Sequence, residues 1–452
     1  MASTYLTRTA GSTGNVQIWT FSAWIKRSRI SNADATQILF GTYTDANNRL
    51  EIGFHNANNF IVKEKQSSST NIDMTTSELL KDPSAWYNLV VAVDTTQATA
   101  SNRVKMYING SQITTWQSGY DNYPNQNYNT LANVSGRTYV IGQEGNNQYY
   151  FDGSMSHVHF VDGTAYPAST FGSTDSVTGE WSINTSPSIT MGTNGFTILK
   201  DGNTITDQSS NSNNFTVAGG TLTNTEDSPS NNFATLNPLN YQLSGCTLAQ
   251  GNTSLTATGG NGWRTFYGTL AASSGKFYWE QKVNSYSGSS HYIGISDIDK
   301  MKNSNDNDFE SASTDAYCYR ADGGKVSKNT LTAGAGASFG AGNIIGIAMD
   351  LVNNKLYFSK DGVWQNSGDP TSGASGTGSF FNITAGKLYT PATATYNTSN
   401  QFFSYNFGNG SFGTTAVTTN SGNGYAGAEG SSIFNYQPPT GYSALSTKGL
   451  NL

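Results

Sequence analysis

The sequence is poor in charged residues, which make up 12% of its 452 positions, against about 25% in an average soluble protein. The net charge is −6 and no stripe of Lys and Arg follows any segment, so we expect no nucleic acid partner. Disordered chains are poor in aromatic residues, whereas aromatics reach 12% here, beside 49 glycines. This composition therefore indicates a folded chain of many short strands joined by turns.

Cysteine is almost absent, and the only two are Cys246 and Cys318. A disulfide framework and a cysteine metal site are therefore not indicated. No run of 18 apolar residues occurs, so we expect no membrane insertion. The first residues, MASTYLTRTAGSTGNVQ, lack the basic and apolar regions of a secretory signal, so we expect no signal peptide.

Helical periodicity is nearly absent as well. TSELLKDPSAW (Thr76–Trp86) predicts one short helix that stops at Pro83. Elsewhere apolar residues recur at every second position, as in VKMYING (Val104–Gly110) and IIGIAMD (Ile344–Asp350). This period of two is typical of strands with one buried face.

One local pattern occurs twice, in Trp86–Gly110 and in Ile344–Trp364. In both segments an apolar run ends in Asp, a polar turn follows, and a second strand closes on Asn109-Gly110 or Asp361-Gly362. Asn-Gly and Asp-Gly supply the positive φ angles of tight turns. Each segment is therefore predicted to be a hairpin with one buried face. Its repetition predicts an all-β chain of two antiparallel β-sandwich domains in tandem.

Proline and low-complexity stretches set the expected boundaries. We predict a first sandwich at residues 1–222 and a proline-containing linker at residues 223–259. A second sandwich is predicted at residues 260–412, followed by an irregular Gly/Ser/Thr-rich tail at residues 413–452.

The first part resembles a concanavalin A-like or laminin-G-like jelly roll. The segments that carry this resemblance are FSAWIKRS (Phe21–Ser28), ILFGTYTDANNRLEIGF (Ile38–Phe54), WYNLVVAVD (Trp86–Asp94), VKMYINGSQI (Val104–Ile113) and IGQEGNNQYYFDGSMSHVHFVDGTA (Ile141–Ala165). The second part resembles a SPRY domain, through SGKFYWEQKV (Ser274–Val283), HYIGISD (His291–Asp297), GNIIGIAMDLVNNKLYFSKDGVW (Gly342–Trp364) and FFSYNFG (Phe402–Gly408).

The tandem as a whole resembles virion structural proteins of marine tailed bacteriophages, through SPSNNFATLNPLNY (Ser228–Tyr241) and PPTGYSALSTKGLNL (Pro438–Leu452). This resemblance implies a fibre, spike or head appendage on the virion surface that is assembled in the host cytoplasm. It implies other virion proteins and a host-surface glycan or receptor as partners, and a homotrimer that gains avidity from repeated weak sites.

An enzyme is the less favoured alternative, and we expect none. Glycoside hydrolases of related fold need two carboxylates that face the sugar, and no E-x-D-x-x-E run occurs. His157 and His159 share a strand face, but no third metal ligand follows by spacing. The spacing G-x-S-x-G of a serine nucleophile elbow occurs once, in GASFG (Gly336–Gly340), within a glycine-rich stretch that has no helical pattern after it.

The most suggestive binding segment is SGYDNYPNQNYNT (Ser118–Thr130). Aromatic rings and amide groups together recognise sugars, and tyrosine and asparagine supply both. The alternative is a surface loop that its own tyrosines hold in place. The candidate glycan-binding residues are Tyr120, Asn122, Tyr123, Asn125 and Tyr128, with Trp364 in the second sandwich by its position near a loop.

No cofactor is expected to be required, although calcium has one candidate site. The segment NSNDNDFE (Asn303–Glu310) contains Asp306, Asp308 and Glu310, whose carboxylate oxygens are the hard ligands that calcium prefers. The segment lacks the glycine and spacing of an EF-hand loop, so a solvated acidic loop is the alternative.

The sequence thus favours a non-catalytic glycan-binding protein on a virion surface. The second hypothesis is a structural decoration or adaptor protein that makes protein–protein contacts only.

Overall fold

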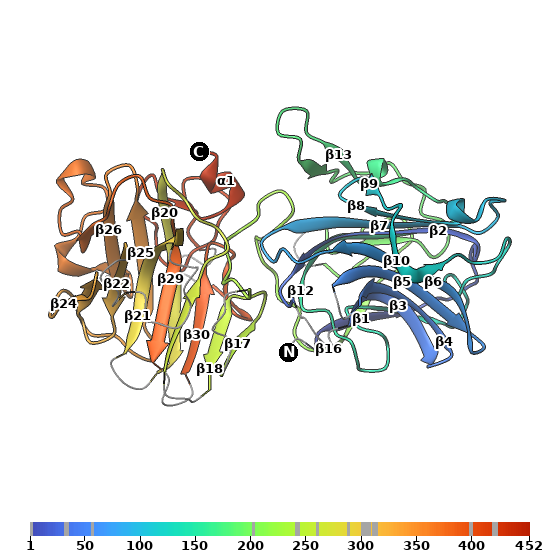
Figure 1. Ribbon diagram of the computed structural model, residues 1–452, viewed down its shortest axis with the longest axis horizontal. Coiled ribbons are helices and arrows are strands. Elements are labelled where there is room, and N and C mark those ends of the chain that lie inside the picture. Colours follow the sequence, from blue (N-terminus) through green and yellow to red (C-terminus); the bar gives the residue numbers. More distant parts are fainter. Residues whose placement is uncertain are drawn as a thin grey trace. The chain divides into compact units, whose positions relative to one another are not determined.

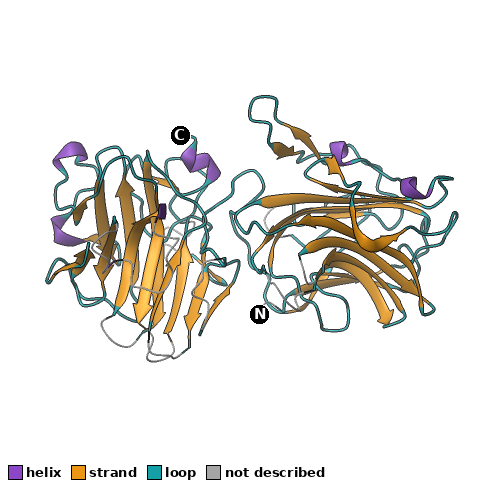
Figure 2. Ribbon diagram, in the orientation of Figure 1, coloured by secondary structure: helices purple, strands orange, loops and turns teal. Residues whose placement is uncertain are grey.

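The computed structural model divides the chain into two compact units, Met1–Leu222 (unit 1) and Thr223–Leu452 (unit 2), and each is described by itself. Figures 1 and 2 show that strands dominate both units. The residues that the structure describes are 3–30, 36–55, 58–200, 204–239, 245–258, 262–286, 290–299, 309, 315–396, 401–417 and 424–452.

Unit 1 is a sandwich of two antiparallel sheets, visible as two layers in Figure 1. The eight-stranded sheet has the order β10 (Trp116–Asn122), β6 (Ser69–Leu79), β5 (Asn59–Gln66), β4 (Asn48–Phe54), β3 (Gln37–Asp45), β11 (Thr138–Ile141), β1 (Tyr5–Thr9), β16 (Thr216–Gly219). The six-stranded sheet has the order β15 (Phe196–Ile198), β12 (Gly153–Asp162), β2 (Ile18–Arg27), β7 (Trp86–Asp94), β8 (Val104–Ile108), β9 (Ser111–Gln112). Apolar side chains from the two facing surfaces form one core, which includes Phe21, Phe40, Phe160 and Phe196.

The outer face of the six-stranded sheet is covered by the segment that carries β13 (Gly172–Thr174) and β14 (Trp181–Ile183). Trp181 packs so closely on the Asn109-Gly110 turn that a Cβ on Gly110 would lie 2.4 Å from its ring. Gly110 also has a φ of +80°, which favours glycine. This covering leaves the outer face of the eight-stranded sheet as the polar face of unit 1.

Unit 2 is also a sandwich of two sheets. The nine-stranded sheet has the order β17 (Cys246–Ala249), β18 (Ser254–Ala257), β30 (Gln401–Asn406), β20 (Lys276–Ser285), β25 (Ile344–Asp350), β26 (Lys355–Lys360), β27 (Val363–Trp364), with β28 (Phe381–Asn382) on β26 and β33 (Ser443–Ala444) on β20. The six-stranded sheet has the order β19 (Trp263–Tyr267), β29 (Tyr389–Tyr396), β21 (His291–Asp297), β22 (Ala316–Arg320), β23 (Lys325–Ser327), β24 (Thr330–Thr332). A separate pair joins β31 (Ser411–Phe412) to β32 (Thr415–Ala416).

The prediction of two antiparallel β-sandwiches is therefore confirmed. Both predicted hairpins are present as β7–β8 and β25–β26. The helix predicted at Thr76–Trp86 is wrong, because residues 76–79 continue β6, where Asn59 pairs with Leu79. In the described part of the chain, α1 (Thr447–Leu450) is the one α-helix, and no helix is long and apolar enough to span a membrane.

The two ends of unit 2 differ from the linker and irregular tail expected at residues 223–259 and 413–452. The first contains β17 and β18, which extend the nine-stranded sheet through β30. The second contains β33, which pairs in parallel with β20 beside Phe277 and Tyr278. Apolar burial explains this order, because large side chains from both segments pack on the central strands of the nine-stranded sheet.

Residues from both ends of unit 2 and from the sheet form one buried apolar cluster. Phe233, from the first end, and Phe434 and Tyr442, from the last, pack on Tyr278 and Tyr357 of the nine-stranded sheet. The two ends also bind each other. The N–H of Ala234 donates to the carbonyl of Leu445 at 2.9 Å, and that of Thr447 to the carbonyl of Asn232 at 2.9 Å.

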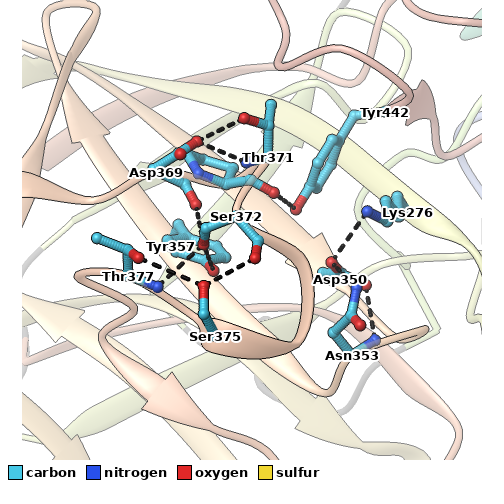
Figure 3. A network of polar contacts seen from close by, with 11 residues as sticks. Lys276, Asp350, Asn353, Tyr357, Asp369, Thr371, Ser372, Ser375, Thr377 and Tyr442 are labelled. Atoms are coloured by element: carbon cyan, nitrogen blue, oxygen red, sulfur yellow. Dashed lines mark hydrogen bonds and ion pairs between the residues drawn. The ribbon is translucent and has the colours of Figure 1, made fainter.

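A network around Tyr442 fixes the last segment to the turns of the sheet (Figure 3). Its hydroxyl donates to the carbonyl of Pro370 at 3.0 Å, and its ring lies 5.6 Å from the Lys276 ammonium. Lys276 in turn forms a 3.2 Å ion pair with the buried carboxylate of Asp350. The loop that follows β27 is thereby held against Tyr442.

Glu280 of β20 is the second anchor of this segment. Its fully buried carboxylate accepts the N–H groups of Asn435 (2.9 Å) and Tyr436 (2.8 Å), and the side-chain amide of Asn406 (3.1 Å). Burial raises the pKa of Glu280 to about 7, and these donors limit the rise because they stabilise the ionised form.

We therefore predict that unit 2 requires its last segment to fold. A chain that ends at residue 412 exposes Tyr278 and Tyr357 and leaves the Glu280 carboxylate buried without two of its donors, and a buried polar group that loses a partner costs about 1–3 kcal/mol. Limited proteolysis and thermal unfolding are expected to show a folded unit 1 and an unfolded unit 2. A chain that ends at Leu450 is the control and should fold, so two intact units in the shorter chain would contradict the prediction.

Candidate binding surface

The outer face of the eight-stranded sheet carries charged side chains because β4 and β5 alternate inward and outward residues along most of their length. In β4, Leu50, Ile52 and Phe54 point into the core, so Arg49 and Glu51 point outward. The same alternation turns Lys63 and Lys65 of β5 outward. A sequence of short hairpins thus presents charged side chains from consecutive strands on one surface.

The register between neighbouring strands aligns four outward-facing polar residues in a row. Glu51 pairs with Lys63, Lys63 with Asp73, and Asp73 with Asn122. We call Glu51, Lys63, Asp73 and Asn122 the polar row. Adjacent strands lie about 4.8 Å apart, so the row crosses β4, β5, β6 and β10 with alternating negative, positive and negative charge.

Direct contacts connect the row to an aromatic ring at its edge. The Lys63 ammonium lies 3.4 Å from Asp73 Oδ1 and 5.1 Å from the centre of the Tyr120 ring. Asn122 donates its side-chain amide to the carbonyl of Thr70 at 3.0 Å. Charged groups and amides that bind hydroxyls therefore stand beside an aromatic face, a combination found where proteins bind sugars.

A guanidinium between two carboxylates closes the other end of the row. Arg49 Nε donates to Glu51 Oε2 at 3.0 Å and lies 3.4 Å from Glu144 Oε1. Burial, together with a hydrogen bond to Glu51, raises the pKa of Glu144 to about 7, while the charge of Arg49 opposes the rise.

The structure divides the candidate residues predicted from Ser118–Thr130. Tyr120 and Asn122 lie together at the polar row, on β10 rather than on a loop. Tyr123 packs on the core with its ring 6.3 Å from that of Trp116, and burial raises its pKa. It therefore anchors the segment after β10.

Tyr128 also serves as an anchor. Its hydroxyl lies 2.7 Å from Glu64 Oε1 and 2.7 Å from Gln66 Oε1. Glu64 is fully buried, accepts the N–H of Leu131 at 3.0 Å, and has its pKa raised to about 7 by burial. Asn125 is exposed in the same loop, and its carbonyl accepts the N–H of Tyr128 at 3.2 Å.

The remaining candidate residues lie elsewhere. Trp364 belongs to unit 2, where its ring is 6.4 Å from that of Tyr278 and packs on the cluster that the chain ends form. The calcium candidates Asp306, Asp308 and Glu310 lie outside the described residues. Within the described ranges, no group of three or more His, Cys, Asp or Glu side chains could hold a metal ion.

Sequence reasoning missed Arg49, Glu51, Lys63, Asp73 and Glu144. The alternating pattern in LEIGF (Leu50–Phe54) indicated that Glu51 points away from the core. What the pattern could not supply is the register between strands, which brings residues from four strands into one row.

Two family models match the chain. Residues 2–169 match the concanavalin A-like lectin/glucanases superfamily, and residues 276–408 match the SPRY domain. The expected tandem of a concanavalin A-like and a SPRY domain is therefore confirmed, and domains of these types bind proteins or carbohydrates.

Several solved structures are similar to parts of the chain. The SPRY domain of human HERC1 is 19% identical, with 38% of this chain and 96% of that chain covered and a TM-score of 0.30. A heptameric SAP-like pentraxin from Limulus polyphemus is 18% identical, with 39% and 78% covered and a TM-score of 0.28. A human SPRY domain is 16% identical, with 36% and 94% covered and a TM-score of 0.27. No curated protein matches the chain significantly.

The division of the tyrosines leads to a stability prediction. Tyr123→Ala removes a ring that packs on Trp116 and the core, so it should destabilise the chain by about 1–3 kcal/mol. Tyr120→Ala removes a half-buried ring that lies beside the Lys63 ammonium, so the free energy of unfolding should change by less than about 1 kcal/mol. Urea unfolding of both variants measures the difference, and equal destabilisation would contradict these assignments.

Proposed function

We propose that the chain is a non-catalytic glycan-binding protein, and that the polar row with Tyr120 is its binding surface. The observation that carries the proposal is the Tyr120 ring beside the Lys63–Asp73 ion pair on the outer face of unit 1. Sugar hydroxyls can bind the charged pair and the amide of Asn122, while the C–H face of a sugar ring packs on Tyr120. The match of unit 1 to the lectin and glucanase superfamily supports this choice of ligand.

We further propose that the protein acts on the surface of a virion, as a fibre, spike or head appendage, and that host-surface glycans are its ligands. The support is the resemblance of the tandem and of its connecting segments to phage structural proteins. In this proposal unit 2 contacts other virion proteins, since SPRY domains are a type that binds proteins.

The second candidate is a decoration or adaptor protein that makes protein contacts only. One observation favours this candidate. The first and last segments of unit 2 pack on its nine-stranded sheet, so that unit 2 forms one compact module. The two candidates differ in whether the polar row binds sugar.

A glycan array distinguishes them. The full chain should bind a defined set of glycans, and Tyr120→Ala should weaken the best of these by about tenfold, or ~1.4 kcal/mol. Tyr425→Ala, which removes another half-buried tyrosine from unit 2, is the matched control and should bind like the unchanged protein.

Each outcome has a meaning. A glycan that binds equally well to Tyr120→Ala would place the site elsewhere. A folded chain that binds no glycan would make the adaptor role the better account.

We also propose that the protein is a homotrimer, since weak sugar sites gain from symmetric repetition. Analytical ultracentrifugation of the full chain should show a trimer at micromolar concentration. A monomer at every concentration tested would reject this assembly.

A further inference from the structure

The loop from Gly142 to Tyr150, between β11 and β12, pairs with the start of β3 and places Gly145 against Tyr43 of β3 and Glu144 against Arg49 of β4. We call residues 142–150 the covering loop. The N–H of Gly142 donates to the carbonyl of Leu39 at 2.9 Å, and the N–H of Ile38 donates to the carbonyl of Tyr149 at 2.8 Å. Gly145 has a φ of +110°, and a Cβ there would lie 2.7 Å from the Cβ of Tyr43. The loop therefore lies tightly against the sheet at the end of the polar row.

The loop is also held by Arg49, which contacts one carboxylate from the loop and one from the polar row. Glu144, from the loop, is 3% exposed, and Glu51, from the row, is 6% exposed. Both lie on the single Nε of Arg49, at 3.4 and 3.0 Å. Arg49 carries one positive charge beside two carboxylates, so protonation of Glu144 lowers the net charge in this buried place.

We propose that the covering loop is a proton-dependent lid on the polar row. The loop stays closed while Glu144 is protonated, and it opens when Glu144 is ionised beside the Glu51 carboxylate. Opening adds Glu51 and the neighbouring Gly41, its cross-strand partner on β3, to the surface that a ligand can reach. This inference rests on the proposed function and names the regulation of the same site.

Other charged and titratable groups surround Glu51 and Glu144. The positive charges on β4 and β5 favour the ionised forms of the two acids, whereas the negative charge of Asp73 on β6 disfavours them. His55, just after β4, has its pKa lowered, first by burial and then by Lys63. The titratable groups that the neighbouring strands place around the pair are Tyr43, Arg49, His55, Lys63, Lys65 and Asp73.

The sign of the effect follows from the raised pKa of Glu144. With the loop closed the pKa is about 7, and in the open loop it returns toward the ordinary value of 4.5. The closed loop therefore binds the proton more tightly, so its stability is fully present below pH 4.5 and is lost as the pH rises through about 7. The closing equilibrium should fall by up to about two orders of magnitude over this range.

Hydrogen exchange of the full chain tests the lid without any glycan. The two reporters are the N–H of Glu144, which donates to the carbonyl of Gln148, and the N–H of Asn147, which donates to Gln143 Oε1. After correction for the intrinsic pH dependence of exchange, their protection should fall by at least about tenfold between pH 5.5 and pH 8.5.

Two variants make the test specific. Glu144→Gln mimics the protonated acid and should keep the reporters equally protected at both pH values. Glu51→Gln removes the charge beside Glu144 and should also keep the reporters equally protected at both pH values. Agreement between the two variants would show that the result does not come from structural damage at one position. Glu180→Gln changes an exposed glutamate outside the loop and should behave like the unchanged protein.

The inference is overturned if protection in the unchanged protein does not depend on pH, or if Glu144→Gln shows the same dependence. Because exchange is measured without ligand, failure of the lid and failure of glycan binding are separate results. Where a glycan binds, its affinity should rise with pH in the unchanged protein and stay level in Glu144→Gln.

Discussion

Glu280 places a carboxylate at the centre of unit 2, and the chain satisfies it with backbone N–H groups 155 and 156 positions further along. Glu64 does the same in unit 1, where Leu131 and Tyr128 are the donors. A buried carboxylate without donors would be strongly destabilising, so each glutamate requires a distant segment to be in place. Neither glutamate is exposed to water, and this burial raises the pKa of both to about 7.

These anchors decide which surfaces remain open for binding. In unit 2 the anchored segment covers the nine-stranded sheet with Phe434 and Tyr442. In unit 1 the segment with Trp181 covers the six-stranded sheet. On the outer face of the eight-stranded sheet the side chains of Lys63 and Asp73 remain 23% and 20% exposed, and the binding proposal therefore concentrates there.

The sequence was sufficient for the type of fold and for the hairpins, because period-two alternation and Asn-Gly or Asp-Gly turns are local signals. It was insufficient for the chain ends, whose low-complexity composition hid single anchoring residues such as Phe434 and Tyr442.

The sequence was also insufficient for the binding surface. Tyr120 and Tyr128 look equivalent in the sequence, yet one lies beside Lys63 on the outer face and the other bonds to a buried glutamate. That difference depends on register and on the β-bulge between Trp116 and Asp121, neither of which composition specifies.

The pairing of Ala234 with Leu445 has a consequence for how the protein is made. The first and last segments of unit 2 meet only after synthesis has passed nearly all of the residues between them. Until Leu445 emerges, a nascent unit 2 exposes Tyr278 and Tyr357 to other chains. Such long-range closure slows folding and leaves apolar surface open during translation. Yield in a host cell should therefore depend on the pace of synthesis and on chaperones that bind this face before the chain is released.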